Sequence, residues 1–540
     1  MRMLNRIGRT RVAGLLATVA LLACSVTIAA GPVAAQVVYH RGNTADPETL
    51  DPHKTSTVYE AHVLRDLFEG LVIHDGKGEI VPGAAESWTV SKNATVHTFK
   101  LRGNAKWSSG DPVTASDFVF AWRRIMNPET GAKYAKILFP IKNAESANKG
   151  KAKPEEIGVK ALDATTLEIT LERPTPYFLE LLAHQTALPL HEASVVKHGT
   201  NFVKPENWVS NGPYVLKEFV PGSHIRTVKN PYFHDAANVK IDAVMFYPTK
   251  DTAAAIRRFE ANELHSNDDL PADQIKALQK KFGDQIKLAP YLGTFYLAVN
   301  TTKVPFNDAR LRQALSLGID REFLAEQIWG NTMVPAYSFV PPGIGNYGEP
   351  AYAESKEMTA DEREEQAKAL LAEMGFGPGK PPLKVEIRFN MTDNNRATVV
   401  AIAEQWKKLG IETTQIHTDA KTHFAHLRDG GDFDVARAGW IGDYSDPQNF
   451  LFLLESDAVG LNYSRWKNLD YDDLMRKAAT ETDMEERTKV LFAAETIFMR
   501  DLPYIPVMYY GSKNIVSKKL AGWSTNLKDV HPTRFLSLAK

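Results

Sequence analysis

The chain has 540 residues, and its 64 basic and 65 acidic residues leave a formal net charge of -1. This balance lacks the basic excess that nucleic-acid binding requires, so no nucleic-acid partner is expected. The single cysteine, Cys24, excludes an internal disulfide and a site built from several thiolates. Stability must therefore come from core size, for which this length suffices. We expect a soluble monomer.

Residues 1–35 predict an export signal. Four arginines precede an apolar run at 12–30, and Val33-Ala34-Ala35 supplies small residues for cleavage after Ala35. One alternative is a transmembrane helix, but no positive stop follows the run. A second alternative is lipidation at Cys24, because Leu21-Leu22-Ala23-Cys24 resembles a lipoprotein box. We favour cleavage after Ala35. No later stretch is long and apolar enough to span a membrane.

The rest of the chain predicts alternating helices and strands. A strand is expected at 37–40, followed by a helix with the apolar positions Val63, Leu64, Leu67 and Phe68, and an amphipathic helix at 117–126 that Thr114 or Ser116 caps. Further helices are expected at 253–262, 273–281, 308–329, 360–374, 397–409 and 484–500, and further strands at 97–102, 167–172, 241–247, 292–300, 383–389 and 505–510. This pattern predicts an α/β protein with at least two lobes.

The stretch 433–450, FDVARAGWIGDYSDPQNF, is the most informative. Its first half predicts a buried strand, and Asp446-Pro447 predicts a helix start with Asp446 as N-cap and Pro447 at the first helical position. Asp443 has no such structural role. It follows Trp440, with Arg437 upstream, and this combination of charges suits a ligand that carries both signs, such as a peptide.

Four motifs in series resemble the signatures of the extracellular solute-binding proteins (family 5) that serve peptide ABC importers. They are LDPHKTSTVYEAHVLRDLFEGL at 50–71, WSSGDPVTASDFVFAW at 107–122, PFNDARLRQALSLGIDRE at 305–322 and FDVARAGWIGDY at 433–444. The resemblance runs from about residue 50 to 516. Oligopeptide-binding and murein-tripeptide-binding members of the family share these motifs, so the motifs do not settle the ligand.

The resemblance implies a bilobal periplasmic binding protein fold, of type II and similar to cluster C, which encloses its ligand between two lobes. Lobe I would comprise 36–68, 193–292 and 511–540, an extra β-rich domain 69–192, and lobe II 293–510. The implied function is capture of short peptides in the periplasm by hinge closure and delivery to the transmembrane and ATPase subunits of an ABC permease. No catalysis and no cofactor are implied. The alternatives are a murein peptide, heme or a nickel complex as the ligand.

The resemblance also implies a set of peptide-binding residues. Asp443 would pair with the peptide α-amino group, in a segment that clamps the ligand as an added strand. Arg437 and Arg428 would receive the carboxylate, depending on peptide length. An aromatic wall and further contact positions complete the set: Trp440, Tyr134, Tyr291, Tyr296, Tyr509, Val58, Asn267, Ile441 and Gly442.

The chain departs from the family pattern at several contact positions. A family acid, lysine, histidine and tryptophan are replaced by Ser56, Trp329, Asn395 and Ala420, respectively. A family cysteine pair that can join two strands is replaced by Gly293 and Ile441. Preferred peptide length and composition are therefore expected to differ.

Simpler interpretations remain for the charged and aromatic residues. Asp443 can bind turn amides, Arg437 can pair with Asp432 or Asp434, and Arg428 can favour a helix C-terminus. The tyrosines can be ordinary packing residues.

A metal-dependent hydrolase is the rival from another class. Residues 417–429 contain His417, Asp419, His423, His426 and Asp429, but they lack the H-E-x-x-H arrangement, so no metal is expected.

Overall fold

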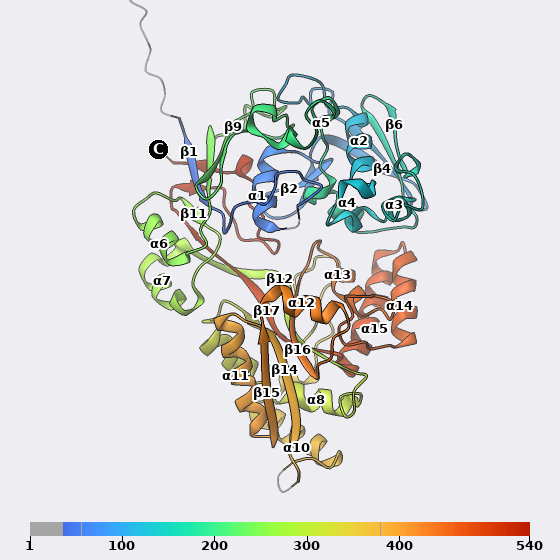
Figure 1. The fold of residues 1–540 in the computed structure, drawn as a ribbon, viewed down its shortest axis with the longest axis vertical. Coiled ribbons are helices and arrows are strands. Elements are labelled where there is room, and N and C mark those ends of the chain that lie inside the picture. The colour runs from blue at the N-terminus through green and yellow to red at the C-terminus, as the bar shows by residue number, and fades with distance from the viewer. Residues whose placement is uncertain (1–35, 56, 378–379, 540) are drawn as a thin grey trace, which may run out of the picture. The chain divides into compact units, whose positions relative to one another are not determined.

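The computed structural model describes residues 36–55, 57–377 and 380–539 (Figure 1). All helices and strands named below belong to these residues. The expected signal peptide lies outside the described residues, and with it Cys24 and Ala35. The departure at Ser56 also lies outside them. Within the described part of the chain, no helix is both long and apolar enough to cross a membrane.

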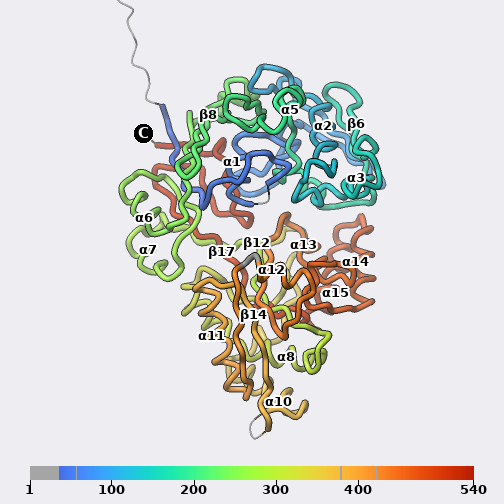
Figure 2. The backbone as a smooth tube through the Cα atoms, viewed as in Figure 1, coloured from blue at the N-terminus to red at the C-terminus, as the bar shows by residue number. Residues whose placement is uncertain are grey.

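Two long antiparallel strands, β12 (Ile286–Val299) and β17 (Tyr504–Val516), form the middle of the largest sheet. They lie side by side although they are far apart in the sequence (Figure 2). The order of strands is β15-β14-β16-β12-β17-β11-β1-β10-β9-β8, and β13 pairs with β17. The other strands are β15 (Ile411–Thr418), β14 (Leu383–Asn390), β16 (Val435–Ile441), β11 (Ser266–Asn267), β1 (Val38–Gly42), β10 (Ala243–Tyr247), β9 (His224–Lys229), β8 (Tyr214–Val220) and β13 (Val334–Pro335).

Alternate residues of β12 enter two separate cores, because successive side chains of a strand point to opposite faces. Phe295 and Leu297 pack with residues of α8 (Ala309–Leu317), α10 (Ala360–Glu373) and α11 (Asp393–Lys407). Tyr296 and Ala298 pack with residues of α13 (Gln448–Leu451), α14 (Leu469–Thr480) and α15 (Met484–Asp501). The sheet is therefore covered on both faces in this region.

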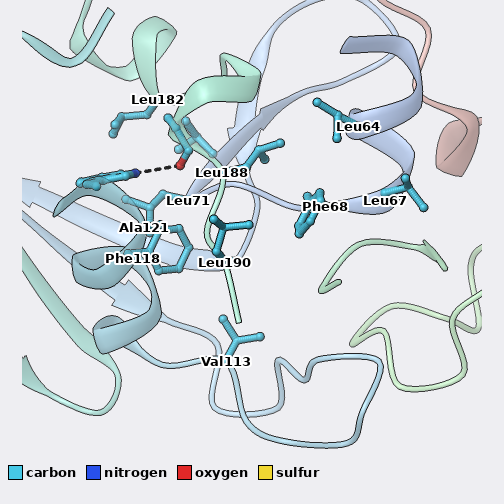
Figure 3. Close-up of a cluster of buried hydrophobic side chains, with 14 of the residues drawn as sticks. Leu64, Leu67, Phe68, Leu71, Val113, Phe118, Ala121, Leu182, Leu188 and Leu190 are labelled. Carbon is cyan, nitrogen blue, oxygen red and sulfur yellow. Dashed lines mark hydrogen bonds between the residues drawn. The ribbon is translucent and has the colours of Figure 1, made fainter. Parts of the chain in front are cut away.

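A second sheet has the order β4-β5-β7-β6, and α2 (Ala115–Met126) contacts β6. Its strands are β4 (Ala85–Val90), β5 (Val96–Leu101), β7 (Thr166–Thr170) and β6 (Val159–Asp163). Thr114 is the N-cap of α2, and its N–H donates to the Asp117 carboxylate (2.7 Å). Leu64 of α1 (Val58–Leu67) and Leu188 share one buried cluster with Phe118 of α2 (Figure 3). The expected extra domain thus shares its core with neighbouring segments.

The remaining elements are short. They include the strand pairs β2–β3 and β18–β19. The other elements are β2 (Val72–His74), β3 (Ile80–Pro82), β18 (Leu520–Ala521), β19 (Ser537–Leu538), α3 (Ala144–Asn148), α4 (Phe178–Leu182), α5 (Glu192–His198), α6 (Thr252–Glu260), α7 (Ile275–Phe282) and α12 (Ala420–Arg428).

The predicted helix at 308–329 is wrong as a single element. α8 ends at Leu317, and after Gly318 the chain starts again as α9 (Arg321–Phe323) followed by a π-helix at Leu324–Ile328. Asp320 causes the restart, because its carboxylate accepts the Phe323 N–H (2.9 Å) as an N-cap. Most other predicted elements are confirmed with shifted ends, and 292–300 and 505–510 are parts of the longer β12 and β17.

Candidate functional site

Asp443 lies in the bend after β16, half-buried. Tyr134, just before a short 3-10 helix at Ala135–Leu138, donates its hydroxyl to Asp443 Oδ2 (2.7 Å). Burial raises the pKa of Asp443, while the Tyr134 hydrogen bond and the nearby Lys136 ammonium act in the opposite direction. No cation of the described chain lies within ion-pair distance of this carboxylate, so its charge is only partly compensated.

Aromatic rings surround this acid. The Lys136 ammonium lies 4.9 Å from the ring centre of Tyr134 and 5.7 Å from that of Trp440. Tyr177 and Tyr444 stack almost in parallel, with their ring centres 4.8 Å apart. Lys136, Tyr177, Asp443 and Tyr444 all line a pocket of about 290 Å³. The acid therefore lies at the edge of a cavity with aromatic walls.

Sequence reasoning missed Lys136, Tyr177 and Tyr444 as members of this pocket. Tyr444 directly follows Asp443, which was a usable signal. Lys136 and Tyr177 come from segments more than 260 positions away in sequence, and nothing in their local pattern marks them.

Arg437 is a buried cation whose hydrogen-bond partners are neutral. Its side chain is 8% exposed, and it donates to Asn390 Oδ1 (2.9 Å) and Tyr510 Oη (2.8 Å). The simpler interpretation as a partner of Asp432 or Asp434 is wrong, since Lys303 pairs with both of these acids (3.1 and 2.6 Å). Within the described residues, no carboxylate lies within ion-pair distance of Arg437.

Asp446 has the expected structural role but a different geometry. α13 begins at Gln448, so Pro447 is the N-cap, and the prediction of Pro447 at the first helical position is wrong. The Asp446 carboxylate accepts the Gln448 N–H (2.9 Å) and forms a bidentate pair with Arg487 (2.8 Å for each bond). Both charged side chains are almost fully buried, which explains why Asp446 is fixed at this corner.

Two tyrosines of the expected aromatic wall lie in the core instead. Tyr296 is 1% exposed and stacks on Tyr504, with ring centres 4.4 Å apart. The Tyr509 hydroxyl accepts the Ser338 N–H (3.0 Å), and its side chain is buried. Tyr296 lies on the face of β12 that packs against α15, whereas Tyr509 lies on β17 and is held by its hydrogen bond to Ser338. The simpler packing interpretation holds for both rings in this structure.

The other expected residues lie at several depths. Trp440 is half-buried and donates its Nε1–H to Asn449 Oδ1 (2.8 Å), and Tyr291 of β12 is half-buried. Asn267 is buried, and its Oδ1 has no hydrogen-bond partner. Val58 is 54% exposed at the start of α1, and Arg428 is exposed at the end of α12.

The two positions at which the family can carry a cysteine pair are opposite each other on neighbouring strands. Gly293 of β12 is directly opposite Ile441 of β16, which is partly exposed. The Gly442 N–H then donates to the Leu292 carbonyl (2.7 Å) and extends the pairing by one bond. The two strands are therefore held in register without a covalent link.

Two of the departures from the family pattern lie around Arg437, whose guanidinium is 4.5 Å from the ring centre of Phe295, the ring that Trp329 contacts edge-on. Asn395 is buried and donates to the carbonyl of Asn390, whose side chain binds Arg437. Trp329 is buried and donates to Thr398 Oγ1 (3.0 Å). The side chain of Ala420 lies outside the described structure.

The histidines of the rival metal hypothesis make structural contacts. His423 Nε2 donates to the Arg437 carbonyl (2.8 Å), and His426 Nε2 donates to that of Asp432 (2.8 Å). Burial lowers the pKa of His423 to about 4. Asp419 caps α12 by accepting the Thr422 N–H (3.0 Å). Among the residues described here, no three His, Cys, Asp or Glu side chains group as metal ligands would.

Comparison with known proteins gives a consistent result. The sequence model described as "Bacterial extracellular solute-binding proteins, family 5 Middle" matches residues 79–461. The chain is 38% identical to the periplasmic murein peptide-binding protein MppA of Escherichia coli (strain K12), over 92% of each chain. It is 36% identical to the periplasmic oligopeptide-binding protein OppA of the same strain, over 95% of each. The crystal structure of Haemophilus influenzae OppA in complex with RPPGFSPFR has a TM-score of 0.78 at 34% identity, covering 94% of this chain and 99% of that one.

Proposed function

This chain belongs to family 5 of the bacterial extracellular solute-binding proteins, and from that premise we propose that it captures short peptides in the periplasm for an ABC importer. Its mixed α/β fold is that of the peptide-binding relatives. In this proposal residues 1–35 direct export, with cleavage after Ala35, and the transmembrane and ATPase subunits of a permease receive the loaded protein. It acts as a binding protein and not as an enzyme.

Two charges without an ion-pair partner in the described chain, Asp443 and Arg437, carry the proposal. Both residues belong to one stretch, β16 and the bend that follows it, and neither has an ion-pair partner in the described chain. An unpaired charge in a desolvated cleft costs several kcal/mol. A zwitterionic peptide supplies an ammonium for Asp443 and a carboxylate for Arg437, so one ligand compensates both.

The spacing of the two charges favours short peptides. Arg437 precedes Asp443 by six positions in the sequence, and an extended chain spans at most about 3.3–3.6 Å per residue, so their Cα atoms are at most about 22 Å apart. A peptide that runs along β16 and reaches both charges therefore has about six residues or fewer.

The main chain of β16 offers a place for such a peptide. On one side, β16 pairs with β12 along its whole length. On the other side, β14 pairs only with Val435 and Ala436. In the described structure no strand pairs with this second edge of Ala438–Ile441, so its backbone groups are available for strand addition, which binds peptides without reading their sequence.

In this proposal the protein captures its ligand by bending at a hinge between the two expected lobes. One lobe comprises residues 36–68, 193–292 and 511–540, and the other comprises 293–510. Residues 69–192 form the extra domain. The expected lobe boundaries at 292/293 and 510/511 lie on the paired strands β12 and β17. There the pairing shifts register between Pro290, opposite Gly511, and Thr294, opposite Tyr509. A local irregularity in a long strand pair is a suitable place for bending.

The proposal is tested with the mature protein after unfolding and refolding to remove bound ligand. Thermal unfolding is compared with free di-, tri- and tetrapeptides, a murein tripeptide, N-acetylated and C-amidated peptides, and Zn²⁺ with and without chelator. A ligand at 100 times its Kd stabilises by about 2.7 kcal/mol, which gives a measurable shift. The proposal is supported if free peptides raise the unfolding temperature and if blocking either end of the peptide makes this rise smaller.

If no peptide raises the unfolding temperature, the proposal is refuted. A rise with Zn²⁺ alone would favour the metal-dependent alternative. Delivery is tested separately with the cognate permease in liposomes. The peptide-loaded protein is expected to stimulate ATP hydrolysis, and equal rates with and without it would contradict an importer role.

A further inference from the structure

The cavity of about 290 Å³ that Asp443 lines, called the Asp443 pocket below, has a charged rim and an apolar interior. Its exposed lining residues are all charged: Lys136, Glu145, Glu172 and Arg173. The other lining residues, apart from Asp443, are apolar or aromatic and are buried or half-buried. Among them are Ile137, Tyr177, Leu181, Tyr444 and Phe452. A ligand group that enters the pocket therefore contacts mainly apolar surface.

The charges that line the pocket are balanced. Three carboxylates and two cations belong to it: Asp443, Glu145, Glu172, Lys136 and Arg173. Glu145 pairs with Lys149, which lies outside the pocket (2.5 Å). Two carboxylates and two cations remain, so the pocket has no excess charge that a charged side chain of the ligand would compensate. A neutral side chain leaves this balance undisturbed.

The aromatic walls of the pocket are held in place without a ligand. The rings of Tyr177 and Tyr444 stack with an angle of 7° between their planes. The Tyr444 hydroxyl donates to Gln448 Oε1 (2.6 Å), and the Arg487 guanidinium lies 5.6 Å from the ring centre of Tyr177. Because these rings are already positioned, little side-chain ordering is required when a ligand binds between them.

The first residue of a bound peptide is the one that reaches this pocket. In the proposed function Asp443 receives the peptide ammonium, and the α-carbon of the first residue is only about 1.5 Å from that nitrogen. Tyr444 and Phe452 follow β16, whereas Arg437 lies within it, so a peptide that runs along β16 leads away from the pocket. Successive side chains of an extended peptide point to opposite sides, so the second side chain points elsewhere.

We propose, building on the peptide-binding function above, that the Asp443 pocket receives the first side chain of the peptide and makes the protein selective for peptides that begin with a large apolar residue such as phenylalanine. The volume of about 290 Å³ is sufficient for an aromatic ring. For comparison, an apolar protein cavity of about 150 Å³ takes up benzene. The Tyr177 and Tyr444 rings offer such a side chain aromatic contacts.

The test measures calorimetric Kd values of the refolded mature protein for the tripeptides Ala-Ala-Ala, Gln-Ala-Ala, Phe-Ala-Ala and Ala-Phe-Ala. We expect Phe-Ala-Ala to bind at least about tenfold more tightly than Ala-Ala-Ala, the gain from burying a large apolar side chain. Gln is neutral but polar, so Gln-Ala-Ala should remain within about threefold of Ala-Ala-Ala. Ala-Phe-Ala should show no comparable gain.

Two variants remove a wall of the pocket from opposite sides, Tyr177→Ala and Phe452→Ala. Each should lower the ratio of the Ala-Ala-Ala and Phe-Ala-Ala Kd values at least about threefold. Phe492→Ala is the control, because it removes a phenylalanine ring that lies in α15, is 44% exposed and does not line the pocket. It should leave the ratio unchanged.

A Phe-Ala-Ala gain below about threefold in the wild type, or an equal gain from Ala-Phe-Ala, would overturn the assignment. A ratio that survives both wall variants, or that Phe492→Ala lowers equally, would also overturn it. If Ala-Ala-Ala binds but phenylalanine at position one adds nothing, this inference fails and peptide binding stands. If no tripeptide binds to the wild type, the proposed function itself is refuted, and this inference with it.

Discussion

Asp443→Asn is the substitution that tests the proposed site most directly. It preserves the shape of the side chain and an acceptor for the Tyr134 hydroxyl, but it removes the charge. Truncating one partner of a buried charge pair costs 2–5 kcal/mol or more in other complexes. Because Asp443 is half-buried and Tyr134 remains, we expect the lower part of that range, about 2–3 kcal/mol, or about 30- to 160-fold in Kd.

The assay is a calorimetric double-mutant cycle. One change is Asp443→Asn, and the other is N-acetylation of the peptide, which removes the charge on the ligand side. If the two groups form a pair, the combined loss should be much smaller than the sum of the single losses. Additive losses, or an Asp443→Asn variant that binds within about threefold of the wild type, would refute the assignment.

The same substitution should stabilise the ligand-free protein. The folded-state pKa of Asp443 is raised, chiefly by burial, so the folded protein holds this proton more tightly than the unfolded chain does. The contribution of Asp443 to stability is thus present below its unfolded pKa and lost as pH rises through the folded value. We expect a higher Tm for Asp443→Asn at pH 7 but not at pH 3, and no gain at pH 7 would contradict this reasoning.

Two further predictions concern the core. Arg487→Met leaves the Asp446 carboxylate buried and unpaired, so urea denaturation should show a loss of about 3–5 kcal/mol, whereas Arg476→Met, from an exposed pair, should change stability by only about 0.5 kcal/mol. Equal losses would contradict a dominant role for burial. Glu495 has its pKa raised to about 7 by burial, so its contribution to stability is present below about pH 4.5 and lost as pH rises through 7. The unfolding free energy of the wild type, relative to that of Glu495→Gln, should fall between pH 5 and pH 8, and a constant difference would show that Glu495 does not titrate in this range.

The elements whose apolar residues follow a clear period were predictable from sequence. The helix at 117–126 and the strand that contains Val435 are examples. The residues on a packed face are apolar, so they recur in the sequence at the spacing of the helix or strand. The break after Leu317 was not recognised, although Asp320 is a standard N-cap. The apolar pattern continues across it into the π-helix, which hides the interruption.

The site was predictable only where its residues lie close together in sequence. Asp443, Trp440 and Arg437 belong to one stretch, and their residue types indicated a ligand with both charges. The contribution of Lys136 and the stacking of Tyr177 on Tyr444 depend on contacts between distant segments, which no local pattern records. The burial of Tyr296 follows from which face of β12 it occupies, and this depends on the cores that cover the sheet.

The unpaired edge of β16 has a consequence for handling the protein. A strand edge with unsatisfied N–H and C=O groups can pair with the edge of another molecule, and proteins commonly block such edges. Ala438–Ile441 have such an edge in the described structure, and Gly439 packs so closely against Tyr510 that a larger residue would require the Tyr510 ring to shift. Bound peptide would cover this edge. The empty protein should therefore be the form that self-associates on concentration, and loading with ligand should keep it monomeric.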